Sequence, residues 1–239
     1  MINFTQLKGK TIAITGASRG IGKETAILLG SFGANLALGA RNVNELKAAV
    51  SELEADIMAV ALDVTREQSI IDFKEQAIKQ FGKIDALINC AGTGMFTNIL
   101  DLSTEDFDNM IAVNLRGTYL CCKHFGRHMV DNRSGQILNM ISIAGTTALP
   151  GCGGYSASKF GIQGFTKVLQ TELRDKGVQV TAVIPGAVNT SFWERFEQKP
   201  DLSLMIPVES LAEHIIYLLC QPKGCVVDEI AIMPPLGIL

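Results

Sequence analysis

The chain has 239 residues, of which 47% are hydrophobic, and its formal net charge is −3. This length fits one large domain with a full core, so we expect a single domain over residues 1–239. Acidic and basic residues are mixed along the chain without a basic stripe, which argues against binding of nucleic acid or of an anionic membrane surface.

The same composition argues against a membrane span and a metal site. No apolar run approaches the roughly 20 residues that a membrane span needs, and the first residues lack the apolar core of a signal peptide. The six cysteines and three histidines form no metal-ligating pattern. We therefore expect no metal, free thiols and a cytoplasmic protein.

Short apolar runs alternate with longer segments of helical period along the whole chain. Strands are expected at 11–15, 34–40, 57–62, 84–89, 136–141, 178–184 and 226–233. Helices are expected at 20–32, 43–54, 66–81, 104–115, 116–131, 154–175 and 208–220. Near-continuous apolar strands separated by helices predict a parallel sheet covered on both faces. With right-handed crossovers, the fold class is α/β, a Rossmann-type doubly wound sheet of about seven strands.

A glycine-rich turn, TGASRGIG (15–22), lies between the first strand and the first helix. Gly16, Gly20 and Gly22 permit a tight turn and a close approach of the backbone to a ligand. The helix that follows offers free N–H groups and the positive end of its dipole to a pyrophosphate. Such a turn alone is only moderately specific, but its place in the first strand–helix unit favours a dinucleotide site.

The end of the second expected strand carries arginine where many dinucleotide sites carry an acid. The sequence there is LGARN, with Arg41 directly after the strand and no acid before Glu45. An acid at this place binds the ribose hydroxyls of NAD, whereas arginine accommodates the 2′-phosphate of NADP. Arg19 adds a second guanidinium, and both can bind phosphate oxygens in forked geometry. We therefore expect NADP(H); two merely solvated arginines would leave the missing acid unexplained.

Further motifs follow in order, and together with the glycine turn they resemble the short-chain dehydrogenase/reductase family from residue 10 to about residue 186. These motifs are LDVT (62–65), NCAG (89–92), VNLRG (113–117), ILNMISIAG (137–145), YSASK (155–159) and PGAVNT (185–190). The resemblance extends to NADP-dependent members such as β-ketoacyl-acyl-carrier-protein reductases.

The resemblance implies a set of cofactor-binding residues. They are Gly16, Ser18, Arg19, Gly20, Ile21, Gly22, Arg41, Asn42, Asp63, Val64, Asn89, Ala91, Gly92, Tyr155, Lys159, Pro185, Gly186, Val188 and Thr190. Three places depart from the family pattern: Cys90 replaces an asparagine, Ile141 replaces a serine, and the C-terminus reads VVDEIAIMPPLGIL without the usual Asp-Gly-Gly.

The resemblance also implies four catalytic residues: Asn114, Ser142, Tyr155 and Lys159. A Tyr and a Lys four residues apart share a helix face, a pattern that many ordinary helix starts also show. In the family, Tyr155 would be the general acid in reduction and the base in oxidation, and Ser142 would bind the substrate oxygen. We expect the Lys159 ammonium to lower the pKa of Tyr155 and, from the resemblance, Lys159 to bind the nicotinamide ribose and Asn114 to hold a water.

The expected function is NADPH-dependent reduction of a ketone or aldehyde, β-ketoacyl compounds among them, by hydride transfer. The alternative is a non-catalytic protein that senses NADP(H) on the same fold. The partner would be a small-molecule carbonyl compound or alcohol, and the resemblance implies a homo-oligomer, a tetramer or dimer.

Residues 190–207 form the substrate lid in the family. Phe192, Trp193, Phe196 and Met205 would line an apolar pocket or pack the lid onto the body, and the sequence leaves both readings open. The segment 93–96 after the NCAG motif would also border the substrate. Neither segment identifies that substrate.

Overall fold

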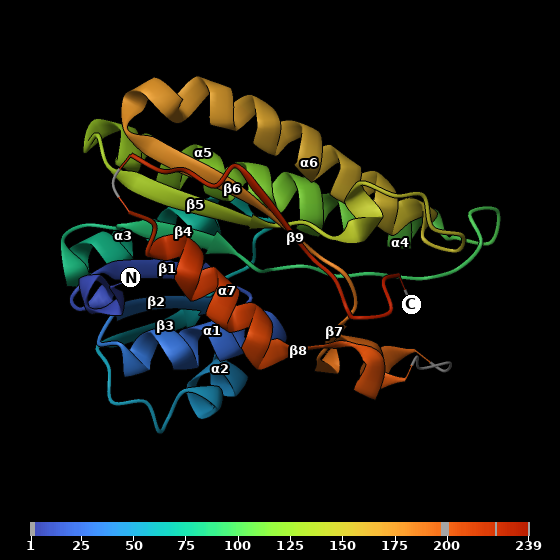
Figure 1. The fold of residues 1–239 in the computed structure, drawn as a ribbon, viewed down its shortest axis with the longest axis horizontal. Helices are drawn as coiled ribbons and strands as arrows, with labels where there is room; N and C mark the ends of the chain where they lie inside the picture. The colour runs from blue at the N-terminus through green and yellow to red at the C-terminus, as the bar shows by residue number, and fades with distance from the viewer. Residues whose placement is uncertain (1–2, 197–200, 223, 239) are drawn as a thin grey trace.

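The computed structural model describes residues 3–196, 201–222 and 224–238. Its central sheet has seven parallel strands in the order β3-β2-β1-β4-β5-β6-β9 (Figure 1). The strands are β1 (Thr11–Thr15), β2 (Asn35–Ala40), β3 (Ile57–Ala61), β4 (Ala86–Asn89), β5 (Gly135–Met140), β6 (Val178–Pro185) and β9 (Glu229–Ile232). A separate short pair joins β7 (Val188–Asn189) to β8 (Ile206–Pro207).

Helices cover both faces of the sheet. They are α1 (Gly20–Ser31), α2 (Val43–Ala49), α3 (Glu67–Phe81), α4 (Thr104–Met110), α5 (Gly117–Asp131), α6 (Gly153–Leu173) and α7 (Val208–Leu219). One apolar core joins α1, α2 and α7 to the sheet, through Leu29, Leu46 and Ile215 among others. A second core joins α3 and α5 to the opposite face, through Phe73 and Phe125. The α/β, doubly wound architecture is therefore confirmed.

The order of the strands creates a crevice at one edge of the sheet. The chain moves outward from β1 to β2 and β3, and then returns to place β4 on the other side of β1. In open parallel sheets ligands bind outside the carboxyl ends of the strands, where the order reverses. The ends of β1 and β4 meet there, with Thr15 paired in register to Asn89.

The structure differs from the expected elements at three places in the chain. The helix expected at 43–54 ends at Ala49, because the chain turns at Val50 and Leu53 donates its N–H to the Val50 carbonyl over 3.2 Å. The expected helices 104–115 and 116–131 are joined without a break by a π-helical segment, Ile111–Arg116. The last strand is shorter than 226–233, since only Glu229–Ile232 pair with β6.

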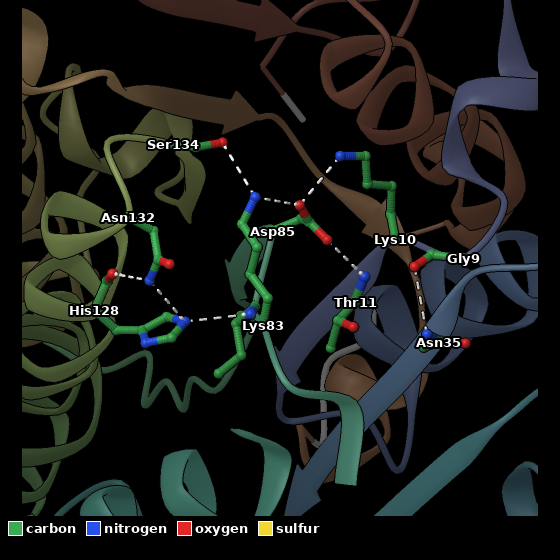
Figure 2. A network of polar contacts seen from close by, with 10 residues as sticks. Gly9, Lys10, Thr11, Asn35, Lys83, Asp85, His128, Asn132 and Ser134 are labelled. Carbon is green, nitrogen blue, oxygen red and sulfur yellow. Dashed lines mark hydrogen bonds and ion pairs between the residues drawn. The ribbon is translucent and has the colours of Figure 1, made fainter. Parts of the chain in front are cut away.

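A polar network closes the opposite edge of the sheet, where the strands begin (Figure 2). Asp85 accepts hydrogen bonds from the Thr11 N–H and from Lys10 Nζ, both over 3.1 Å, and Lys83 Nζ lies 3.1 Å from the same carboxylate. Partial burial raises the pKa of Asp85, but the Thr11 bond and the two lysines outweigh it, so the pKa lies below its usual value. This carboxylate therefore ties the start of β1 to the start of β4.

Within the described part of the chain, no helix is long and apolar enough to cross a membrane. The same residues contain no group of three or more His, Cys, Asp and Glu side chains that could hold a metal ion.

Candidate active site

A cavity of about 1160 Å³ lies at the carboxyl edge of the sheet and collects most of the expected site residues. The expected residues that line it are Gly16, Ser18, Arg19, Gly20, Ile21, Gly22, Arg41, Asn42, Asp63, Val64, Ala91, Gly92, Ser142, Tyr155, Lys159, Pro185, Gly186, Val188 and Thr190. Asn89 and Asn114 are not among its lining residues.

The glycine turn at the start of α1 is packed too tightly for side chains at two positions. A Cβ on Gly16 would lie 2.8 Å from the backbone of Ala91, and one on Gly22 would lie 2.5 Å from the Gly16 carbonyl oxygen. Gly16 and Gly20 also have positive φ, +69° and +54°, which side-chain-bearing residues rarely adopt. Helix α1 begins after Arg19 without a side-chain cap, so its first N–H groups are available to a phosphate. The turn thus fits the pyrophosphate of a dinucleotide.

Two guanidinium groups lie beside this turn. Arg19 and Arg41 are both exposed and both line the cavity, and no carboxylate of the described residues forms an ion pair with either. Unpaired guanidinium groups suit a phosphate monoester. This end of the cavity therefore fits a nucleotide with an additional phosphate on its ribose.

Asn42 and Asp63 also have local structural tasks. Asn42 Oδ1 accepts the N–H groups of Asn44 and Glu45, each over 3.1 Å, and so caps α2. Asp63 Oδ1 accepts from Thr65 N–H and Thr65 Oγ1, over 3.0 and 2.7 Å. These bonds fix the loops after β2 and β3 that form the floor of the nucleotide end.

Ser142, Tyr155 and Lys159 converge at the centre of the cavity. Ser142 follows β5, and its Oγ accepts the Ala144 N–H over 3.2 Å. Ser142 also lies close enough to the hydroxyl of Tyr155, in the first turn of α6, to lower the pKa of that hydroxyl. Lys159 lies on the next turn, with its Nζ 5.6 Å from the centroid of the Tyr155 ring and donating to the Met140 carbonyl over 2.8 Å.

The expected lowering of the pKa of Tyr155 is wrong for this chain without a ligand. Burial of the hydroxyl raises the pKa of Tyr155 to about 12, and the hydrogen bond with Ser142 offsets only part of that rise. Burial also lowers the pKa of Lys159 to about 8. The physical reason is that partial removal from water disfavours the charged forms of both groups, and that Lys159 Nζ is directed to the Met140 carbonyl.

Asn114 is fully buried and supports the site from below. Its Oδ1 accepts the Thr93 N–H over 2.8 Å, and its Nδ2 donates to the Thr93 carbonyl over 2.8 Å and to Ser158 Oγ over 2.9 Å. Both amide hydrogens are thereby used. The side chain therefore holds the loop after β4 against α6, a structural task that the sequence did not reveal.

Asn89 is buried in the same layer. Its Nδ2 donates to Asn139 Oδ1 over 2.8 Å, and Asn139 in turn donates to Thr166 Oγ1 over 3.0 Å. These bonds link β4, β5 and α6 beneath the cavity floor. The Asn89 side chain is therefore turned into the core, and the role of Asn89 in binding the cofactor stays a prediction.

The sequence left open whether the lid residues line an apolar pocket or pack the lid onto the body, and the structure places them differently from one another. Phe192 and Trp193 line the cavity. Phe196 instead stacks on Phe96, with centroids 4.7 Å apart and planes 8° from parallel, and Met205 is buried and does not line the cavity. Residues 197–200 of the expected lid lie outside the described residues.

The structure adds lining residues for which the sequence had no signal. Leu149 and Pro150 precede α6, and Ile238 comes from the C-terminal segment that departs from the family pattern. Pro234 is buried against Gly186, where an added Cβ would lie 2.7 Å from the proline ring. This packing directs the chain end toward the cavity, near β7 (Figure 1).

Comparison with known proteins places this arrangement in a family. The family model described as short chain dehydrogenase matches residues 10–201. A 3-oxoacyl-[acyl-carrier-protein] reductase of Synechocystis is 35% identical over 92% of this chain and 93% of its own length.

Two solved structures resemble the whole chain. An alcohol dehydrogenase from the archaeon Thermococcus sibiricus, complexed with 5-hydroxy-NADP, has a TM-score of 0.85 at 33% identity and covers 93% of this chain and 95% of its own. A metagenomic short-chain oxidoreductase in complex with NADP has a TM-score of 0.84 at 31% identity, covering 97% and 99%. The chain therefore belongs to the short-chain dehydrogenase/reductase family, and it is an oxidoreductase that uses a nicotinamide cofactor.

Proposed function

We propose that this chain reduces the carbonyl group of a ketone or aldehyde to an alcohol with NADPH. The observation that carries the proposal is that Ser142, Tyr155 and Lys159 line one cavity together with the glycine turn, with Lys159 Nζ 5.6 Å from the centroid of the Tyr155 ring. A bound nicotinamide would supply hydride to the carbonyl carbon. The side chains then have to bind the carbonyl oxygen and deliver a proton to it.

Tyr155 is the proton donor in this proposal. Its raised pKa, about 12, keeps the hydroxyl protonated at neutral pH, as an acid in reduction must be. Ser142 would donate a hydrogen bond from its Oγ to the carbonyl oxygen of the substrate, on which negative charge develops during reduction. Burial lowers the pKa of Lys159 to about 8, so this side chain is still mainly a cation at neutral pH. Its Nζ lies 5.6 Å from the centroid of the Tyr155 ring. These protonation states favour reduction over oxidation near pH 7.

The preference for NADPH rests on Arg19 and Arg41. Both are unpaired among the described residues and flank the nucleotide end of the cavity, where the second-strand acid of an NAD site is missing. Related structures that bind NADP or a derivative of it support the same choice. Glycines 16, 20 and 22 would hold the pyrophosphate on the N-terminus of α1.

The test is nicotinamide oxidation by the purified full-length chain against a panel of carbonyl compounds. The panel contains aliphatic ketones, aldehydes, aromatic ketones and β-ketoacyl thioesters, each with NADPH and with NADH. We expect turnover of at least one class, with NADPH preferred. Tight NADPH binding without turnover of any compound would contradict the proposal and favour the sensing alternative, for which the site gives no specific support.

We also propose that the protein forms a homo-oligomer. Tyr119 on α5 and Phe160 and Val168 on α6 are exposed apolar side chains on neighbouring helices, and large exposed apolar patches often mark interfaces. Light scattering on the purified chain tests this, and a monomer at micromolar concentration would contradict it.

A further inference from the structure

Four aromatic rings gather around Tyr155, the proposed proton donor. Phe96 is at the centre of this aromatic cluster, which comprises Phe96, Tyr155, Phe192, Trp193 and Phe196. The Phe96 ring meets Tyr155 edge-on, with centroids 5.5 Å apart and planes at 78°. Phe192 and Trp193 lie 5.9 and 5.7 Å from Phe96. Rings in such tilted and edge-to-face arrangements attract one another beyond their contact area.

The rings are held in place by backbone contacts. Trp193 Nε1 donates to the Val188 carbonyl over 2.9 Å, and Thr190 Oγ1 accepts the Phe192 N–H over 3.3 Å. Gly94 lets Phe192 and Tyr155 approach, because a Cβ there would lie 2.7 Å from Phe192 Cζ and 3.2 Å from Tyr155 Cδ2. The cluster is therefore a built wall rather than a chance contact of mobile side chains.

Three members of the cluster present surface to the cavity in addition to Tyr155. Phe96, Phe192 and Trp193 all line it, and Leu149, Pro150 and Ile238 complete the apolar surroundings of this end. A substrate whose carbonyl reaches Ser142 and Tyr155 must pass its remaining atoms along these rings. A flat aromatic ring gains the extra attraction of edge-to-face or offset-stacked pairs with them, whereas a puckered saturated ring of similar size lacks the π quadrupole that supplies it.

We propose that the substrate carries an aromatic ring a few bonds from its carbonyl group, and that Phe96 selects it through ring-to-ring contact. This inference rests on the proposed carbonyl reduction and names the substrate class. Phe96 is a specificity-determining residue here, while the proton donor stays Tyr155.

The experiment compares two ketones that differ only in the flatness of a remote ring. The carbonyls of 4-phenylbutan-2-one and 4-cyclohexylbutan-2-one have the same local chemistry, and the cyclohexyl group is slightly more apolar, so burial of area alone favours the cyclohexyl compound. We expect kcat/KM with NADPH to favour the phenyl compound by about two- to tenfold, the usual worth of an aromatic pair.

Variants then test the residue. In Phe96→Leu the phenyl-to-cyclohexyl ratio should fall to about one, and in Phe96→Tyr, which keeps a ring, it should persist. Phe4→Leu is the matched control, because Phe4 stacks on Phe32 at the opposite edge of the sheet and should leave the ratio unchanged. If Phe96→Leu fails to fold by circular dichroism, the wild-type ratio and Phe96→Tyr still decide the question.

A binding measurement gives an independent readout. Trp193 is the single tryptophan of the chain, so its fluorescence reports ligands at the cluster. With NADP⁺ present, 4-phenylbutan-2-one should change this fluorescence at a lower concentration than its cyclohexyl counterpart.

Each outcome has one meaning. A wild-type ratio at or below one, or a ratio unchanged in Phe96→Leu, overturns the aromatic proposal and leaves carbonyl reduction standing if either ketone or an aliphatic compound turns over. Absence of turnover with every carbonyl compound overturns the proposed function itself.

Discussion

The tight turn at Gly16 gives a prediction that can be worked out from geometry. Gly9 and Gly16 have nearly the same φ, +72° and +69°. An added Cβ at Gly9 meets nothing within 4 Å, whereas at Gly16 it lies 2.8 Å from the Cα and N atoms of Ala91. Substituting alanine at the two positions therefore imposes the same backbone strain but different packing.

The shared strain is about 1 kcal/mol for alanine at positive φ. In a chain of this size that lowers Tm by about 2–4 °C, and Gly9→Ala should show this and no more. Gly16→Ala must also displace backbone at the end of β4, since its neighbour is main chain and cannot rotate away. We expect it to cost at least about 1 kcal/mol more and to weaken NADPH binding by tenfold or more.

The assays are urea unfolding followed by circular dichroism and titration of NADPH fluorescence. Gly9→Ala should bind NADPH with the affinity of the unmodified chain. If Gly16→Ala matches Gly9→Ala in both unfolding free energy and NADPH affinity, the close approach of the turn to Ala91 is not what shapes the site.

Three further predictions concern charge. The pKa of Asp85 lies below its usual value, so its stabilisation is present above about pH 4 and is lost as pH falls through the lower folded-state value. Asp85→Asn should therefore cost about 1 kcal/mol at pH 7 in urea unfolding, and the difference should shrink as the pH is lowered below about 4. A difference that does not depend on pH would refute the role of the charge. The reduction rate should fall as pH rises through about 8, where the Lys159 ammonium loses its proton, and a pH–rate profile flat to pH 10 would contradict this. Arg41→Asp should raise KM for NADPH about tenfold or more and shift the cofactor preference toward NADH. Steady-state kinetics with both cofactors tests this. An unchanged ratio of kcat/KM with NADPH to kcat/KM with NADH would show that Arg41 does not bind the phosphate.

The sequence predicted the central strands of the sheet well because those strands are buried on both faces. All five residues of β1 are buried, so an unbroken apolar run was sufficient to find it. Helix α2 was predicted too long because Leu53 satisfies the helical spacing, yet it reaches the core after a turn, where its Cδ1 would lie 3.7 Å from a Cβ added to Gly30. An apolar pattern indicates which residues are buried, and both a helix and a turn can bury them.

The π-helical segment before α5 has no counterpart in the sequence pattern. A π-helical turn holds one residue more than an α-helical turn. The extra residue interrupts the α-helical spacing of apolar residues, so this spacing predicts two separate helices instead of one continuous one. Asn114 lies in this segment and is buried at 0% exposure.

Residues of the candidate site could be predicted where the residue type at a given place in the fold indicates a single role. The glycines of the tight turn and Arg41 after β2 belong to that group. Asn89 and Asn114 are different, because an amide serves a ligand and a buried network equally well, and only the fold shows that both face the core. Ile238 depends on how the C-terminal segment packs on Gly186, which is a long-range contact without a local signal. The pKa of Tyr155 likewise depends on burial that a spacing of residues does not measure.

The central claim is that the Tyr155 hydroxyl delivers the proton. The most direct measurement is single-turnover NADPH oxidation by Tyr155→Phe with the best substrate of the panel, together with NADPH affinity. We expect an unchanged affinity for NADPH and a rate lower by about two to four orders of magnitude, the usual contribution of a general acid. A rate equal to that of the unmodified chain, with NADPH bound equally well, would contradict it.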